Sequence, residues 1–143
     1  MFDLTKYSEY KLDSMKVLTV SDVVDGMVYS PQIRNAYSDV EAVFGCGDLP
    51  YYYLEYIVST LDKPVFYVRG NHAYVIEYGE EGPRAHPQGA INLHRRVVRH
   101  RGLLLAGIEG SLRYRPGEYQ YTQSEMWGFV FGLIPGLMAN KIQ

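Results

Sequence analysis

Three short polar segments are notable because each directly follows an apolar run of strand-like composition. They are Ser21-Asp22, Gly47-Asp48 and Gly70-Asn71-His72. Two carboxylates and an amide oxygen that came together would form a site for hard or borderline cations, and a neighbouring imidazole would transfer protons near neutral pH. These residue types therefore indicate metal-dependent acid–base chemistry, provided that the three segments meet in space.

The chain between these polar ends alternates between strand-like and helix-like patterns. Apolar runs at 16–20, 40–46 and 64–68 are too short for helices and suit strands buried in a parallel sheet. Between them we expect a helix that begins at Ser30 and another that has Pro50 in its first turn. The β-α-β-α-β order predicts right-handed crossovers, which would bring the three polar ends to one edge of the sheet.

The same residues are also compatible with local turn and cap chemistry. Asp48 stands just before the second predicted helix and would serve as its N-cap, and Asp22 would cap a turn. Glycine and asparagine both tolerate the left-handed backbone region, so Gly70 and Asn71 also suit a plain turn. The coincidence of polar residues at three consecutive strand ends, with His72 beside the third, favours a site.

The middle of the chain predicts loops and one hairpin. Residues 73–90 are rich in glycine and proline, which is typical of a surface loop. The apolar stretches 91–98 and 103–110 predict an antiparallel hairpin. Residues 111–121 then predict another loop before the final element.

The last element is predicted to be a helix. Thr122 and Glu125 have the capping-box spacing, and the helix is expected to run toward Lys141. Its uncharged run from 126 to 139 is too short to cross a bilayer, which takes about 20 residues. We therefore expect this run to pack against a sheet.

The chain as a whole has the composition of one globular domain. Its 143 residues, 47% of them hydrophobic, suffice for a core, and we expect one domain at 15–143 behind a flexible N-terminal arm at 1–14. A formal net charge of −2 argues against binding to nucleic acid or to a membrane. A single cysteine, Cys46, excludes an internal disulfide, and the polar start is no signal peptide, so a cytoplasmic location is expected.

In their order and strand context the three polar segments resemble the first three motifs of the calcineurin-like metallophosphoesterases. The resemblance covers about residues 15–113. It implies an α/β fold, a four-layer α/β/β/α sandwich of mixed sheets, with two metal ions such as manganese, iron or zinc. By this resemblance Asp22 binds one metal ion, Asp48 bridges both and Asn71 binds the second. His72 is then the general acid that faces the leaving group of a phosphate mono- or diester.

The first motif departs from the family pattern. The family has a histidine where this chain has Val24, and valine cannot bind a metal ion. Asp25 is the nearest alternative ligand. The purple acid phosphatase branch also lacks this histidine and has a tyrosine three residues after the bridging aspartate, a position that Tyr51 holds here. Tyr51 also falls on the apolar stripe of the second predicted helix, so a metal ligand and a core tyrosine both stay open.

The later histidine motifs of the family have no counterpart, because no histidine follows His100. We therefore expect an amino-terminal portion of the fold that is truncated at its C-terminus, holds metal ions weakly and is impaired as a hydrolase. Arg113, after the last predicted strand, is the candidate for steadying a substrate phosphate. Two other functions stay open: an inactive scaffold or binding module, or part of an oligomer or an assembly with a complementary chain.

Overall fold

A computed structural model describes residues 15–73, 76–79 and 82–141, and the predicted N-terminal arm lies outside them. The described chain has the α/β class that the sequence predicts, with three helices and four small sheets. The elements in chain order are β1 (Val17–Val20), α1 (Ile33–Ala36), β2 (Ala42–Cys46), α2 (Tyr51–Leu61), β3 (Val65–Val68), β4 (Glu77–Gly79), β5 (Gly82–Arg84), β6 (Ile91–Asn92), β7 (Val97–His100), β8 (Leu103–Ala106), β9 (Ser111–Leu112), β10 (Gln120–Tyr121) and α3 (Gln123–Lys141).

The main sheet has four strands in the order β1-β2-β3-β6, and each of its described pairings is parallel. Val20 lies opposite Gly45 and Val68 lies opposite Cys46, so the first three strands end nearly level. The parallel arrangement predicted for these strands is confirmed. The antiparallel pairs among the described strands are the separate hairpins β4–β5 and β7–β8.

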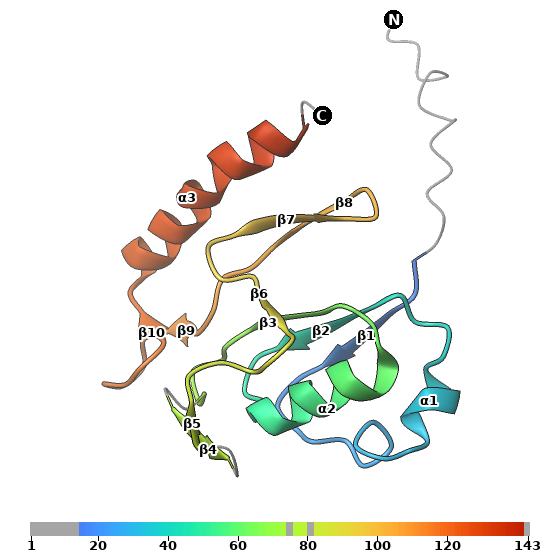
Figure 1. The fold of residues 1–143 in the computed structure, drawn as a ribbon. Coiled ribbons are helices and arrows are strands. Elements are labelled where there is room, and N and C mark those ends of the chain that lie inside the picture. Colours follow the sequence, from blue (N-terminus) through green and yellow to red (C-terminus); the bar gives the residue numbers. More distant parts are fainter. Residues whose placement is uncertain (1–14, 74–75, 80–81, 142–143) are drawn as a thin grey trace, which may run out of the picture.

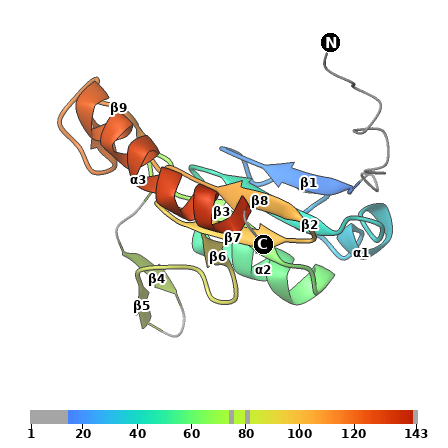
Figure 2. The same ribbon diagram turned by 90° about the horizontal axis from the view of Figure 1, so that it is seen from above.

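The elements lie in layers (Figures 1 and 2). Helices α1 and α2 cover one face of the main sheet, and the β7–β8 hairpin lies over the other face. Helix α3 packs on the outer side of that hairpin. The β4–β5 hairpin lies beside the sheet, below the segment that leads to β6.

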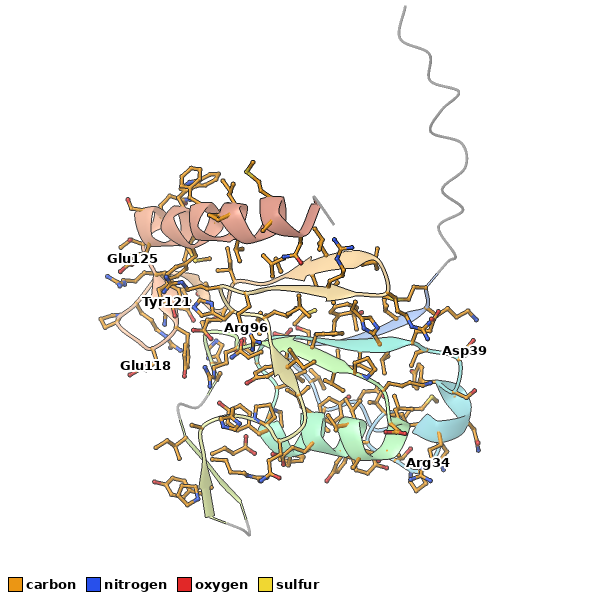
Figure 3. The ribbon with its side chains drawn as sticks, turned by 45° about the horizontal axis from the view of Figure 1, so that its top comes forward. Arg34, Asp39, Arg96, Glu118, Tyr121 and Glu125 are labelled. Atoms are coloured by element: carbon orange, nitrogen blue, oxygen red, sulfur yellow. The ribbon has the colours of Figure 1, made fainter. Side chains whose placement is uncertain are left out.

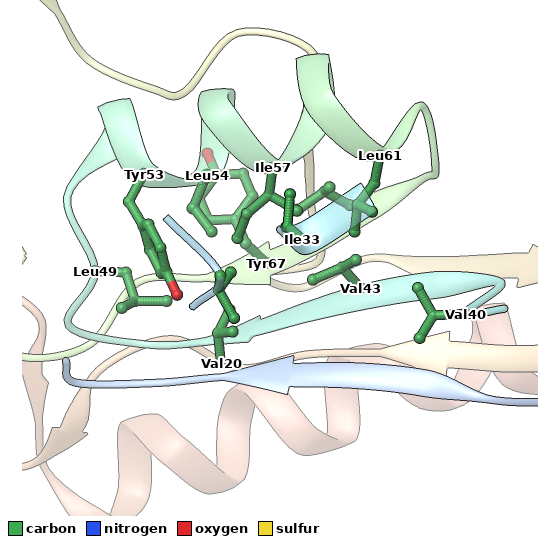
Figure 4. Packing of buried hydrophobic residues seen from close by; sticks show 12 residues of the cluster. Val20, Ile33, Val40, Val43, Leu49, Tyr53, Leu54, Ile57, Leu61 and Tyr67 are labelled. Carbon is green, nitrogen blue, oxygen red and sulfur yellow. The ribbon is translucent and has the colours of Figure 1, made fainter. Parts of the chain in front are cut away.

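The larger core fills the space between α2 and the main sheet (Figure 4). Leu54, Ile57 and Leu61 recur every three or four residues and point at the sheet, where they meet side chains such as Val43. Full burial of an aliphatic side chain contributes about 1.5–3 kcal/mol, so packing rather than helix propensity holds α2 in place. A smaller core joins Phe66, on the opposite face, to Val98 and Leu105 of the β7–β8 hairpin.

The first helix is shorter than predicted. It spans a single turn, and its N-cap is Gln32 rather than Ser30. The Ser30 hydroxyl donates instead to the Met27 carbonyl at 2.7 Å, which uses the side chain in the preceding turn. The helix that follows has no side-chain cap, because its N-cap position falls on Gln32, whose side chain accepts no hydrogen bond from the first turn.

The predicted hairpin strand at 91–98 is divided between two sheets. Ile91–Asn92 pairs in parallel with β3 and becomes the fourth strand of the main sheet. The antiparallel hairpin begins only at Val97, and its turn places Arg101 and Gly102 at φ +48 and +81. Positive φ at both turn residues is typical of the type I′ turn that suits the twist of paired strands.

Helix α3 has the predicted capping box and runs without interruption through Pro135. The Glu125 carboxylate accepts the Thr122 N–H at 2.7 Å, and the Glu125 N–H donates to the Thr122 hydroxyl at 3.3 Å. Packing against the hairpin buries Leu133, but Phe131 and several other apolar side chains of the helix face solvent. The expected packing of this apolar run is therefore right for one side of the helix and wrong for the other. In the part of the chain that the structure describes, no helix is long and apolar enough to cross a membrane.

Candidate functional site

The carboxyl ends of β1, β2 and β3 meet at one edge of the main sheet. The Asp22 N–H donates to the Gly47 carbonyl at 3.2 Å, which connects the first and second strand ends. The His72 N–H donates to Asp48 Oδ1 at 2.7 Å, which connects the second and third. The three polar segments are therefore neighbours, as expected for consecutive parallel strands that end level.

The Asp48 carboxylate fills the space where a side chain on Gly70 would lie. A Cβ atom at Gly70 would be 2.0 Å from Asp48 Oδ1, and a Cβ atom at Gly47 would be 3.1 Å from the Gly70 Cα. Gly47 also has φ +109, a backbone conformation that residues with a Cβ atom rarely adopt. The two glycines therefore let the chain leaving β3 pass directly against the carboxylate.

Asp48 is not the cap of α2, so that alternative is wrong. The N-cap of α2 is Pro50, and the N–H groups of Tyr51 and Tyr52 face the Glu77 carboxylate. The Tyr51 N–H donates to Glu77 Oε2 at 2.6 Å. A carboxylate at a helix N-terminus satisfies its unpaired N–H groups and complements its dipole. Glu77 of β4 supplies that carboxylate, and Asp48 instead contacts the chain that follows β3.

Both candidate carboxylates stand on residues with a left-handed backbone. Asp22 has φ +64 and Asp48 has φ +52. This region costs a non-glycine residue about 1–2 kcal/mol, although aspartate tolerates it better than most residues. Positions that keep such a conformation are concentrated at ligand sites, where the surrounding structure holds them.

Each of the three candidate ligands has one polar side-chain atom in a hydrogen bond with another group of the protein. Asp22 Oδ2 accepts from the Ser21 hydroxyl, Asp48 Oδ1 accepts from His72, and Asn71 Nδ2 donates to the Tyr114 hydroxyl at 2.9 Å. Within the described residues no hydrogen bond is donated to the second oxygen of either carboxylate or to Asn71 Oδ1. Carboxylate and amide oxygens of this kind are the ligand types that a hard cation such as Mn²⁺ prefers.

The site lacks a dense cluster of strong ligands. Across 15–73, 76–79 and 82–141, no three His, Cys, Asp or Glu side chains gather in an arrangement that would hold a metal ion. A metal site at these strand ends would therefore need the amide oxygen of Asn71 as its third protein ligand. Three oxygen ligands, with no imidazole among them, would bind a transition metal weakly.

The first motif contributes little beyond Asp22. Val24 is partly buried against the core between α2 and the sheet, so this position points at the core rather than at the strand ends. Asp25 Oδ1 accepts the N–H groups of Met27 at 2.9 Å and Val28 at 3.0 Å, which closes a local turn. The Asp25 carboxylate is thus engaged by backbone N–H groups two and three residues further along the chain.

Tyr51 lies beside the site within a network of polar contacts. Its side chain is buried, and its hydroxyl donates to the Ala85 carbonyl at 3.1 Å and accepts from Arg69 Nε at 3.2 Å. Tyr51, Arg69 and Asp48 line the same small pocket. The structure thus places this phenol next to the Asp48 carboxylate, with a guanidinium as its polar neighbour.

Arg113 is directed away from this pocket. Its Nε and Nη2 atoms each donate to the Gln120 carbonyl at 3.3 Å, and Nη2 lies 3.6 Å from a Glu125 carboxylate oxygen. The guanidinium therefore connects β10 to the start of α3. The next residue, Tyr114, is the one that reaches the site, through Asn71.

Comparisons of this chain with protein-family models, with curated proteins and with solved structures find no match. The function proposed below therefore rests on the residues of this chain alone.

A buried polar cluster behind the strand ends was not predicted. Glu109 is 5% exposed, and its carboxylate lies 3.5 Å from Arg69 Nη1 and accepts the Tyr121 hydroxyl at 3.1 Å. His94 Nδ1 accepts the Glu109 N–H at 3.1 Å, and its Nε2 lies 3.4 Å from Glu109 Oε1. We call these four residues the Glu109 cluster. One signal in the sequence was an acidic residue within an otherwise apolar strand-like run.

The Glu109 cluster is connected to the end of β3, next to the candidate site. The Gly110 N–H donates to the Arg69 carbonyl at 2.8 Å, immediately before the Gly70 turn. Figure 3 shows Tyr121 at the end of the molecule where α3 begins, near Glu125. Burial, followed by the neighbouring Glu109 carboxylate, raises the pKa of Tyr121 to about 12, so its hydroxyl stays protonated and donates. Burial also lowers the pKa of His94, in keeping with an Nδ1 that accepts a hydrogen bond.

Proposed function

We propose that this protein is a metal-dependent phosphoesterase that hydrolyses phosphate mono- or diesters, on a metallophosphoesterase-like sandwich. The observation that carries the proposal is the contact between Asp48 and the backbone of His72, across a glycine that leaves no room for a side chain. This contact holds a carboxylate and a histidine together at the edge where parallel sheets bind ligands.

The side chains at the strand ends would have two separate roles, metal binding and proton donation. Asp22, Asp48 and Asn71 would each supply an oxygen to a cation, and the hydrogen bonds from Ser21 to Asp22 and from Asn71 to Tyr114 would help to orient two of these groups. A bound divalent or trivalent ion, such as Mn, Fe or Zn, would offset negative charge on the phosphate and lower the pKa of water. The His72 backbone contacts Asp48, and its exposed imidazole would give a proton to the departing alkoxide.

Turnover of an aryl phosphate with Mn²⁺ tests this proposal. We expect slow, metal-dependent hydrolysis that requires millimolar metal, because the site offers few ligands. Asp48→Asn should lose metal binding, seen as loss of the change in the Mn²⁺ electron paramagnetic resonance signal on adding protein. His72→Ala should keep metal binding and lower kcat at least ~100-fold, the usual contribution of a general acid.

The matched control is Asp39→Asn. This exposed carboxylate pairs with Lys16 at the opposite ends of β1 and β2, so its loss should change neither metal binding nor turnover. Full activity of both Asp48→Asn and His72→Ala would reject the roles assigned here.

A second candidate function is a binding or scaffold module without catalysis. Two observations favour it: Val24 packs into the core where a ligand would be needed, and the Arg113 guanidinium is engaged by Gln120 and Glu125. Metal binding without turnover, at every metal tested, would support this module over the enzyme. For either function the cytoplasm remains the expected location.

A further inference from the structure

Helix α3 presents two opposite faces with different surroundings. On the inner face Leu133 is buried, and a Cβ atom at Gly136 would lie 3.0 Å from Val97 of the hairpin. The outer face carries four large apolar side chains that are 52%, 60%, 43% and 62% exposed, namely Trp127, Phe131, Ile134 and Met138. Side chains project from α3 on the side turned away from the hairpin (Figure 3). This outer stripe has no covering partner among the described residues.

The spacing of the outer stripe is that of a helix-pairing seam. The four residues follow one another at intervals of four, three and four, which is the a/d spacing of a coiled coil. At 100° per residue they fall within an arc of about 60° around the helix. No charged residue occurs between Met126 and Asn140, so the seam carries no charge along three turns of the helix.

The surface at the first half of the seam is hollowed. An open hollow is lined by Ser124, Trp127, Gly128 and Phe131. These positions are i, i+3, i+4 and i+7, the four positions that form a hole in knobs-into-holes packing. The Trp127 and Phe131 rings are stacked with their centroids 5.7 Å apart, and a Cβ atom at Gly128 would meet nothing within 4 Å.

We propose that α3 pairs with α3 of a second copy of this chain through the outer stripe. One helix offers both the apolar knobs and the four-residue hole, so the surface is complementary to itself, as a two-fold interface requires. The absence of charge on the seam means that two copies meet without like-charge repulsion. A polar partner would find no group on this stripe with which to pair.

The size of the stripe predicts a weak, reversible dimer. Two aromatic and two aliphatic side chains, each about half exposed, offer roughly 300–400 Å² per chain, because a fully buried aromatic side chain contributes 150–250 Å². The pair of chains would bury about 600–800 Å², below the standard size of a stable interface. We therefore expect a dimer whose population grows with concentration over about 1–300 µM.

Sedimentation velocity of the full chain over that range tests the proposal. The wild type should shift from monomer toward dimer as concentration rises. Phe131→Glu should raise the dimer Kd at least ~10-fold, as expected for an aromatic anchor. Gly128→Leu fills the hollow and should raise the dimer Kd in the same way. Because leucine has a higher helix propensity than glycine, unfolding of α3 cannot explain this loss.

The control is Tyr78→Glu, which places the same charge on an 81% exposed aromatic position of β4 and should leave the dimer intact. Circular dichroism of each variant verifies that the helix is retained. A wild type that stays monomeric throughout the range would overturn the proposal. So would a monomer that binds neutral phosphatidylcholine vesicles through α3, because the stripe would then be a lipid-binding face.

Discussion

At the scale of single residues, the site depends on close contact between a carboxylate and a backbone. Asp48 Oδ1 accepts the His72 N–H and occupies the place of a side chain on Gly70. An aspartate that merely ended a strand would not need a glycine facing it across the sheet edge. The requirement at Gly70 is steric, and it is therefore open to a direct test.

Gly70→Ala should displace the Asp48 carboxylate. The added methyl group would lie 2.0 Å from Asp48 Oδ1, so the carboxylate or the chain at Asn71 must move. We expect a loss of about 1–3 kcal/mol in the free energy of unfolding, as for other overpacked sites. Mn²⁺ affinity, measured by calorimetry, should fall at least ~10-fold if Asp48 is a ligand.

Gly26→Ala is the control for this substitution. Gly26 lies in the turn that follows β1, and a Cβ atom there meets nothing within 4 Å. Stability and Mn²⁺ affinity should both stay at the wild-type level. If Gly70→Ala behaved in the same way, the packing of Asp48 against Gly70 would not matter for metal binding.

At the scale of elements, partly or fully buried polar contacts connect separate parts of the fold. Glu77 of β4 caps α2, and the Glu109 cluster connects the end of β3 to β10, next to the start of α3. In the cluster His94 accepts a backbone hydrogen bond through Nδ1 and is therefore neutral in the fold. Protonation of Nδ1 would break this bond beside a buried Glu109.

The stability of the protein should fall on acidification through the titration of His94. Burial keeps its pKa in the fold below 6.5, the ordinary value for histidine, although Glu109 opposes this shift and Arg95 and Arg69 add to it. The unfolded chain thus takes up this proton at a higher pH than the fold does, and stability is lost as pH drops below about 6.5. Urea unfolding at pH 7.5 and 5.5 measures the change.

The variant His94→Gln separates this effect from the other titrations. Glutamine retains an acceptor for the Glu109 N–H but takes up no proton, so stability should decrease less between pH 7.5 and 5.5 than in the wild type. The control His86→Ala removes an exposed histidine and should retain the full decrease. Equal pH dependence in the wild type and His94→Gln would contradict the assignment.

At the scale of the whole molecule, burial is concentrated on one side. The sheet and α2 share the larger core, whereas α3 is packed against the hairpin and β10 through a single face. Local stability follows the amount of apolar surface that an element buries with its neighbours. The layered arrangement therefore predicts a gradient of stability across the molecule.

Hydrogen exchange read out by mass spectrometry should reveal this gradient. Amides of β2 and β3, which have partners on both edges, should exchange at least ~10-fold more slowly than those of α3. The experiment belongs at low micromolar concentration, where the proposed dimer does not protect α3. Equal protection of α3 and the central strands would show that the helix is held more firmly than its contacts imply.

The sequence alone determined the features that depend on near neighbours in the chain. Its apolar runs located the first three strands, its three- and four-residue spacing located the buried face of α2, and Thr122 and Glu125 located the start of α3. The order of these elements then placed three polar ends at one edge, because consecutive parallel strands end on the same side of a sheet.

Tertiary structure alone decided which distant groups meet. No periodicity in the sequence indicates that Glu77 caps α2, that Tyr114 reaches Asn71, or that α3 leaves Phe131 exposed. Periodicity reports which residues share a face of one element, but contacts between elements depend on how their axes and loops are placed. That placement is fixed by the packing of the whole chain, so the partners of each polar group become known only in the folded molecule.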